Sequence, residues 1–177
     1  VLEMTGGGSF QAGSLSILSD ESESAPPNDA FENRLLLTGK DAQISGSNAD
    51  ASSELGEPLH GNLLPPQRSV WWKWLAPSDG TLALETLQAS FRAGLSVYAG
   101  WKLDDLIEVA KSESPGAGLS LAVKGGVEYS IALSGDSGGQ GSFQLRLAFD
   151  GDFTNPPPTN DSFSEAKLLF GEDLQVQ

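Results

Sequence analysis

The chain has 177 residues, no cysteine, and 24 acidic against 10 basic residues, which leaves a net charge of −14. This charge repels nucleic acid, so no nucleic-acid partner is expected, and the missing cysteines exclude disulfides, thiolate metal sites and a cysteine nucleophile. Twenty-one glycines and ten prolines are typical of short strands joined by turns. No apolar run reaches the roughly 20 residues that cross a bilayer, so we expect no membrane insertion.

The first 18 residues contain two short apolar segments around a glycine turn. They resemble the alternating segments at 127–133 and 143–149, which the pattern predicts to form a hairpin. We therefore interpret 1–18 as the last hairpin of a preceding repeat or as a donated strand. Residues 19–27, which are acidic and serine-rich, are interpreted as a linker.

Short strands dominate the rest of the chain and follow one another at spacings of roughly 8 to 12 residues. The predicted strands are 34–37, 43–45, 69–76, 81–86, 95–100, 107–109, 119–123, 127–133 and 143–149. Residues 119–123 are expected to pair with 127–133 through a tight hairpin, and only 103–106 suggests a helical turn. The prediction is an all-β fold, an antiparallel, jelly-roll-like β-sandwich of about eight or nine strands with little helix.

Bulky residues on one face of each strand are expected to fill the space between the two sheets. In the strand at 69–76, Trp71 and Lys73 fall on one face, whereas the larger set, Val70, Trp72 and Trp74, falls on the face that is expected to point inward. Trp71 and Trp101 are the tryptophans that can lie exposed and stack on a sugar ring. The expected core consists of Val70, Trp72, Trp74, Leu82, Leu84, Val97, Tyr129 and Ile131.

A motif near the start of the chain occurs again near its end. Asn-Asp-x-Phe stands at 28–31 and at 160–163, with the asparagines 132 residues apart (160 − 28), and both copies continue into Leu-Leu and then Gln followed by Ile or Val. Self-similarity at a fixed period is typical of repeat proteins. We interpret 28–149 as one complete β-sandwich repeat, 150–159 as a Pro-rich linker, and 160–177 as the first strands of the next repeat or a donated strand.

The two flanking segments carry alternating apolar residues. A strand with such a pattern and no partner is an exposed edge, which proteins avoid. We predict that these segments pair with neighbouring copies by strand addition. The residues expected to make this pairing are Leu168, Phe170, Leu174, Val176, Leu15 and Ile17.

Two groups of polar residues are candidate metal sites. The Asn-Asp pairs either cap a turn or contribute oxygens to calcium, which takes six to eight of them; they are Asn28, Asp29, Asn160 and Asp161. The second group lies in one long loop and consists of Glu54, Glu57 and His60. These side chains either hold the loop by hydrogen bonds or bind zinc, which needs at least three protein ligands. A lone histidine without a glycine-flanked serine specifies no nucleophile, so no catalytic residue is expected.

Ordered motifs between 28 and 149 resemble a β-sandwich module that occurs in tandem in large secreted or surface proteins of bacteria. They are Asn-Asp-x-Phe (28–31), Gly-Ser-Asn (46–48), Glu-x-Gly-Glu-Pro-x-His (54–60), Ser-Val-Trp-Trp-x-Trp-x-Ala-Pro (69–77), Gly-Thr-x-x-x-x-Thr (80–86), Val-Tyr-x-Gly (97–100) and Tyr-x-Ile (129–131). The module is similar in turn to the bacterial pre-peptidase C-terminal domain, whose collagenase members bind calcium at similar motifs. At 90–92 the chain has Ser-Phe-Arg where the module usually has Ser-Phe-Asp.

This resemblance implies export and a binding or spacer role, and no reaction. We therefore expect a non-enzymatic structural repeat of a secreted or cell-surface bacterial protein, acting as a stalk, adhesin spacer or filament subunit. Its partners would be neighbouring copies, and no cofactor is expected apart from calcium. The alternative is a calcium-dependent or carbohydrate-binding module attached to a secreted enzyme.

Overall fold

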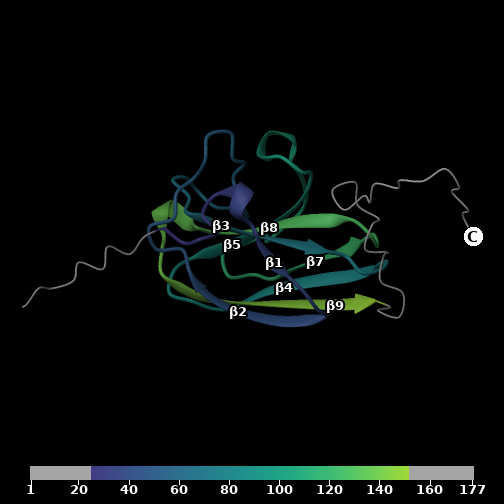
Figure 1. Cartoon of the computed structure of the whole chain (residues 1–177). Coiled ribbons are helices and arrows are strands. Elements are labelled where there is room, and N and C mark those ends of the chain that lie inside the picture. Colours follow the sequence, from purple (N-terminus) through teal and green to yellow (C-terminus); the bar gives the residue numbers. More distant parts are fainter. Residues whose placement is uncertain (1–24, 152–177) are drawn as a thin grey trace, which may run out of the picture.

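The computed structural model describes residues 25–151, which form a sandwich of two sheets (Figure 1). One sheet has the strand order β1-β3-β8-β5-β6 and the other β2-β9-β4-β7. The strands are β1 (Leu35–Leu37), β2 (Asp41–Ser47), β3 (Ser69–Leu75), β4 (Gly80–Ala89), β5 (Ala93–Ala99), β6 (Ile107–Lys111), β7 (Leu119–Val123), β8 (Glu128–Gly135) and β9 (Ser142–Gly151). The helical elements of this part of the chain are the single turns η1 (Phe31–Asn33), η2 (Leu103–Asp105) and η3 (Asp136–Gly138). The prediction of an all-β sandwich is confirmed.

The two predicted hairpins are wrong. β7 pairs with β4 in one sheet, whereas β8 lies between β3 and β5 in the other, and β9 returns to the first of these sheets. The connections on either side of β8 therefore cross between the sheets. Residues 129–135 of β8 are all buried, because this strand has a partner on each side and both faces of its sheet are covered. A short loop is compatible both with a hairpin and with a crossing between sheets about 10 Å apart, so loop length alone does not decide.

The segment that precedes β3 supplies an edge strand to each sheet. β1 runs parallel to β3, with Leu35 opposite Trp72. The chain then turns at Gly39, whose φ of 95° favours glycine, and continues as β2 beside β9 in the other sheet. As a result β1 and β2 are both edge strands.

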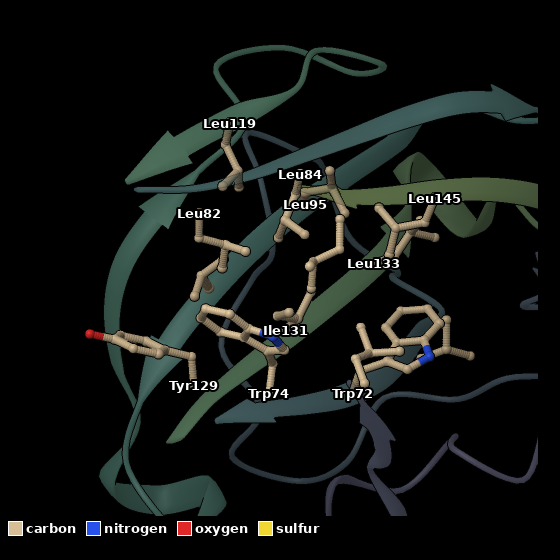
Figure 2. Packing of buried hydrophobic residues seen from close by; sticks show 14 of the residues in the cluster. Trp72, Trp74, Leu82, Leu84, Leu95, Leu119, Tyr129, Ile131, Leu133 and Leu145 are labelled. Atoms are coloured by element: carbon tan, nitrogen blue, oxygen red, sulfur yellow. The ribbon is translucent and has the colours of Figure 1, made fainter. Parts of the chain in front are cut away.

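Side chains from both sheets meet in the core, where Trp72 and Trp74 pack beside leucines (Figure 2). The Trp72 ring lies edge-on to Phe143 with 5.8 Å between ring centroids, and Trp74 lies 5.3 Å from Phe149. The residues expected in the core are all buried, namely Val70, Trp72, Trp74, Leu82, Leu84, Val97, Tyr129 and Ile131.

The described chain enters and leaves the sandwich at opposite ends. Pro26 and Pro27 line a groove together with Ser47 and Phe143, so the chain enters beside the end of β2 and the start of β9. β9 then runs through ten residues to Gly151. At about 3.3 Å per residue this strand spans about 30 Å. In Figure 1 the described chain begins at the left and β9 ends at the right.

Candidate functional site

The Asn-Asp motif fastens the start of the described chain to β3 and to the loop that precedes it. The side-chain amide of buried Asn28 donates to the carbonyl oxygen of Trp71 at 2.9 Å, and the Trp71 N–H donates to the Asn28 carbonyl at 2.9 Å. The Asp29 carboxylate accepts from the backbone N–H of Ser52 at 2.6 Å and from its hydroxyl at 3.0 Å. These contacts fix the position at which the sandwich begins.

The calcium site stays a prediction. Both carboxylate oxygens of Asp29 accept hydrogen bonds, and the Asn28 amide nitrogen is bound to backbone. Within residues 25–151, no three histidine, cysteine, aspartate or glutamate side chains lie together as a metal site would require. Asn160 and Asp161 lie outside the described residues.

The loop between β2 and β3 contains a buried hydrogen-bonded network. His60 Nε2 lies 2.6 Å from Glu57 Oε1, and its Nδ1 lies 2.8 Å from the Tyr98 hydroxyl. The Ser69 hydroxyl also donates to Glu57 Oε1. With Glu57 ionised, Nε2 carries a proton, so in a neutral imidazole Nδ1 accepts from Tyr98. Burial raises the pKa of the Tyr98 hydroxyl, which keeps this donor protonated.

This network holds the loop in place and lacks the geometry of a hydrolytic site. The carboxylate of Glu57 stands between the Ser69 hydroxyl and His60, so the imidazole is not placed to take a proton from the serine. All of these side chains are buried from solvent. Glu54, the third candidate zinc ligand, instead accepts from the Phe31 N–H at 2.6 Å. The hydrogen-bonding interpretation of this loop therefore accounts for the contacts of all three candidate ligands.

Trp71 is not exposed, and the prediction that it stacks on a sugar is wrong for this reason. It points to the outer face of its sheet, but the loop before β3 and the turn η1 cover that face. Phe31 and His60 both lie edge-on to its ring, at 5.1 and 4.9 Å between centroids, and Tyr98 lies at 5.9 Å. Trp71 thus belongs to a second apolar cluster outside the main core, formed by Phe31, Trp71, Tyr98 and Ala132. We call this the outer cluster.

Trp101 is the predicted sugar-stacking residue that remains accessible. Its side chain is 65% exposed, and its backbone N–H donates to Asp105 at 3.2 Å. It lies just after β5 and before β6, where Ile107 is also exposed. Stacking on a sugar by Trp101 stays a prediction.

The sequence analysis did not identify two buried residues, Asn48 and Tyr98, whose polar groups hold the loops around β3 in place. Asn48 bridges the carbonyls of Arg68 and Gly139 and accepts from the N–H of Gly141. Tyr98 connects β5 to the loop through His60. Asn48 lies in the Gly-Ser-Asn motif, which could have marked it, whereas nothing in the local sequence pairs Tyr98 with His60. The arginine of the altered Ser-Phe-Arg segment, Arg92, forms an ion pair with Asp136 at 3.1 Å.

The predicted pairing residues all lie outside the described part of the chain; they are Leu168, Phe170, Leu174, Val176, Leu15 and Ile17. Among residues 25–151, a groove of about 200 Å³ lies between the edge strands β1 and β2. Apolar side chains line its interior, contributed by Leu35, Ile44, Trp72 and Phe143. No helix among residues 25–151 is long and apolar enough to cross a membrane.

No family model matches the chain, and no curated protein matches its sequence. Among solved structures, it is similar to a periplasmic inhibitor of g-type lysozyme from Aeromonas hydrophila, with 13% identity, a TM-score of 0.48 and coverage of 66% of this chain and 96% of that one. It is also similar to the pre-peptidase C-terminal domain of collagenase from Bacillus anthracis (12% identity, TM-score 0.41, 66% and 92% coverage). The mitogen of Yersinia pseudotuberculosis is a third (11% identity, TM-score 0.41, 65% and 92% coverage).

Proposed function

We propose that this chain is a non-enzymatic spacer module from a tandem array in a secreted or cell-surface bacterial protein. The observation that carries the proposal is the position of the ends of the described chain. The chain enters beside Ser47 and leaves after Gly151, at opposite ends of β9. Domain termini are often close together, whereas modules joined end to end gain length when their termini are far apart.

The repeated motif supports an array because its shared residues are the ones that anchor the first strands. Of the 18 residues at 28–45, eight are identical at 160–177. Six of these eight have structural roles here: Asn28, Asp29 and Phe31 contact β3 or its loop, Leu37 is buried, Gly39 makes the turn, and Asp41 pairs with Arg146. In the proposed array, residues 160–177 therefore begin another sandwich.

The flanking segments also correspond to strands that pair with each other. Gly8-Ser9-Phe10-Gln11 is identical to 141–144 at the start of β9, and 173–176 corresponds to 41–44 in β2. In this sandwich β2 and β9 pair along seven residues. This supports strand sharing in which 168–176 of one copy pairs with 15–17 of its neighbour.

The arrangement of the array is tested by comparing the full chain with a chain that carries one additional 132-residue repeat. Small-angle X-ray scattering is expected to show that the maximum dimension grows by at least about 30 Å, the length of β9. The matched control replaces the Pro-Pro-Pro run at 156–158 by Gly-Ser-Gly, which keeps the linker length and removes its stiffness. An additional repeat that folds back and adds no length would contradict the spacer role.

A carbohydrate-binding module is the second candidate, because Trp101 is 65% exposed. The Trp101→Ala variant is then expected to lose any glycan signal that the unaltered chain gives on an array of polysaccharides. A variant at another exposed apolar residue, Leu64→Ala, serves as the control. A blank array for the unaltered chain removes this candidate.

The second candidate function, a ligand-binding module, also includes calcium binding at Asn28 and Asp29. If it occurs, millimolar calcium raises the melting temperature relative to excess EDTA, because a ligand of the folded state stabilises that state. The Asp29→Asn variant is expected to abolish the difference. Equal melting temperatures in calcium and EDTA remove calcium from the proposal.

A further inference from the structure

The four edge strands of the sandwich differ in how well they are protected from pairing with another chain. β1 has only three residues. β6 and β7 lie against each other across the sandwich, and β6 also carries Glu108, Lys111 and a bulge in its pairing with β5. Short length, charge, bulges and coverage are the usual means of blocking an edge. Among residues 25–151, β2 is neither short nor bulged and carries one charge, and the residues of the entering chain that line the groove beside it, Pro26–Asn28, lie at its end near Ser45–Ser47.

β2 pairs with β9 through seven residues without a bulge, contains no proline, and has a single charged residue, Asp41, at one end. Among residues 25–151 no strand pairs with its outer edge. The groove of about 200 Å³ beside this edge places Leu35 and Ile44 within reach of an added strand. β2 is therefore the edge at which a further strand can join.

The hydrogen bonds to β9 determine which groups of β2 face outward. The Phe149 N–H donates to the Lys40 carbonyl, and the Asn48 N–H donates to the Gly141 carbonyl. In an antiparallel pair these bonded positions alternate, so the even-numbered residues from 40 to 48 face β9. The backbone N–H and C=O groups of Asp41, Gln43, Ser45 and Ser47 therefore point to the open edge.

We propose that the edge of β2 binds β2 of a second copy of this chain, in an antiparallel pair with Ile44 opposite Ile44 of the other copy. In this register Gln43 faces Ser45 of the other copy, and Asp41 faces Ser47. The outward-pointing backbone groups then meet one another, which an antiparallel ladder requires. No like charges stand directly opposite, and the inward-pointing side chains that meet are apolar or glycine, namely Ala42, Ile44 and Gly46.

This pairing goes beyond the proposed array, since it joins copies side by side instead of end to end. A pair of seven-residue strands is smaller than the roughly 1,200–2,000 Å² interfaces of stable complexes, so one module pairs weakly. Two arrays that pair through several modules gain strength by multivalency. The net charge of −14 on each copy opposes the contact, so added salt strengthens it.

The test measures the self-association of the full chain by sedimentation equilibrium over a wide concentration range. The Ser45→Pro variant removes an outward N–H without touching the bonds to β9, and Ser45→Ala is the matched control. We expect a reversible dimer whose dissociation constant rises at least about tenfold in Ser45→Pro, since two hydrogen bonds are lost per dimer, and stays unchanged in Ser45→Ala. Near-ultraviolet circular dichroism checks that both variants are folded.

Disulfide trapping provides a second measurement, because the chain has no cysteine of its own. Opposed residues at a non-hydrogen-bonded position lie about 4.5 Å apart between Cα atoms, within disulfide range. Ile44→Cys is therefore expected to form a covalent dimer much faster than Val109→Cys, which places a thiol on the exposed face of β6. A chain that stays monomeric, with equal trapping at both sites, overturns the inference. A dimer that Ser45→Pro leaves unchanged also overturns it, and would instead fit the pairing of 168–176 with 15–17 proposed for the array.

Discussion

The main core and the outer cluster lie on opposite faces of the same sheet and are built by different means. The main core joins two sheets through the packing of apolar and aromatic side chains. The outer cluster joins a sheet to loops, and its Trp71 and Tyr98 rings lie against the hydrogen-bonded pair of His60 and Glu57. A sheet can therefore be buried on both faces even when only one of them meets another sheet.

The comparison shows that polar side chains are needed where a loop, instead of a second sheet, covers an apolar surface. Loops have no backbone ladder, so a loop that covers an apolar surface must satisfy its own N–H and C=O groups through side chains. Gln67 does this by accepting from the His60 N–H and donating to the His60 carbonyl. The outer cluster accordingly depends on specific hydrogen bonds, whereas the main core depends on volume and shape.

The largest expected effect lies in the main core. Trp72→Ala should lower the free energy of unfolding by about 3–5 kcal/mol, because it opens a cavity beside Phe143. Urea denaturation followed by circular dichroism measures this. Trp101→Ala, at an exposed position, is the control and should stay within about 0.5 kcal/mol. Equal losses in both variants would contradict the burial of Trp72 in the main core.

A smaller loss is expected in the hydrogen-bonded network of the loop that covers the outer cluster. Glu57→Gln keeps the size of the side chain but replaces a carboxylate oxygen that accepts from His60 and Ser69, and should cost about 1–3 kcal/mol. The same urea titration applies, with the exposed Glu113→Gln as its control. A variant as stable as the control would show that the network does not support the loop.

The attachment of the entering chain to the outer cluster should be weaker still. Asn28→Ala removes the amide that donates to the Trp71 carbonyl and leaves the backbone bond between these residues, which should cost about 1 kcal/mol. Asn33→Ala, exposed in η1, is the control. Differential scanning calorimetry should show a lower melting temperature for Asn28→Ala alone, and a reversed order would contradict the anchoring role.

The smallest effects are expected at turns outside both clusters. Hydrogen bonds from Lys124 and from the Leu64 backbone N–H lower the pKa values of Asp79 and Asp136, respectively. A folded-state pKa below the unfolded one adds stability above the unfolded value, about 4, which is lost as pH falls through the folded value. Melting temperatures should therefore fall in acid below about pH 4, and the double variant Asp79→Asn and Asp136→Asn should flatten that fall. An unchanged slope would contradict these assignments.

Much of the fold could be predicted because alternation is a local property. The strand at 69–75 shows the limit of this rule: alternation correctly placed Val70, Trp72 and Trp74 inward but implied that Trp71 could be exposed. Trp71 is covered by His60 and Phe31, which come from segments about 11 and 40 residues earlier (71 − 60 and 71 − 31). Which loop folds over which face depends on such distant contacts, and no single segment encodes them.

The sequence by itself determined the all-β class, the approximate strands, the main core and the presence of a repeated motif. The tertiary structure decided that β7, β8 and β9 alternate between sheets, that His60 and Glu57 are buried with Tyr98, and that β2 is an edge strand of the sandwich formed by residues 25–151. The physical reason is that apolar periodicity fixes which face of a strand is buried. Which strand lies beside it depends on how all segments together bury that surface and satisfy their backbone groups.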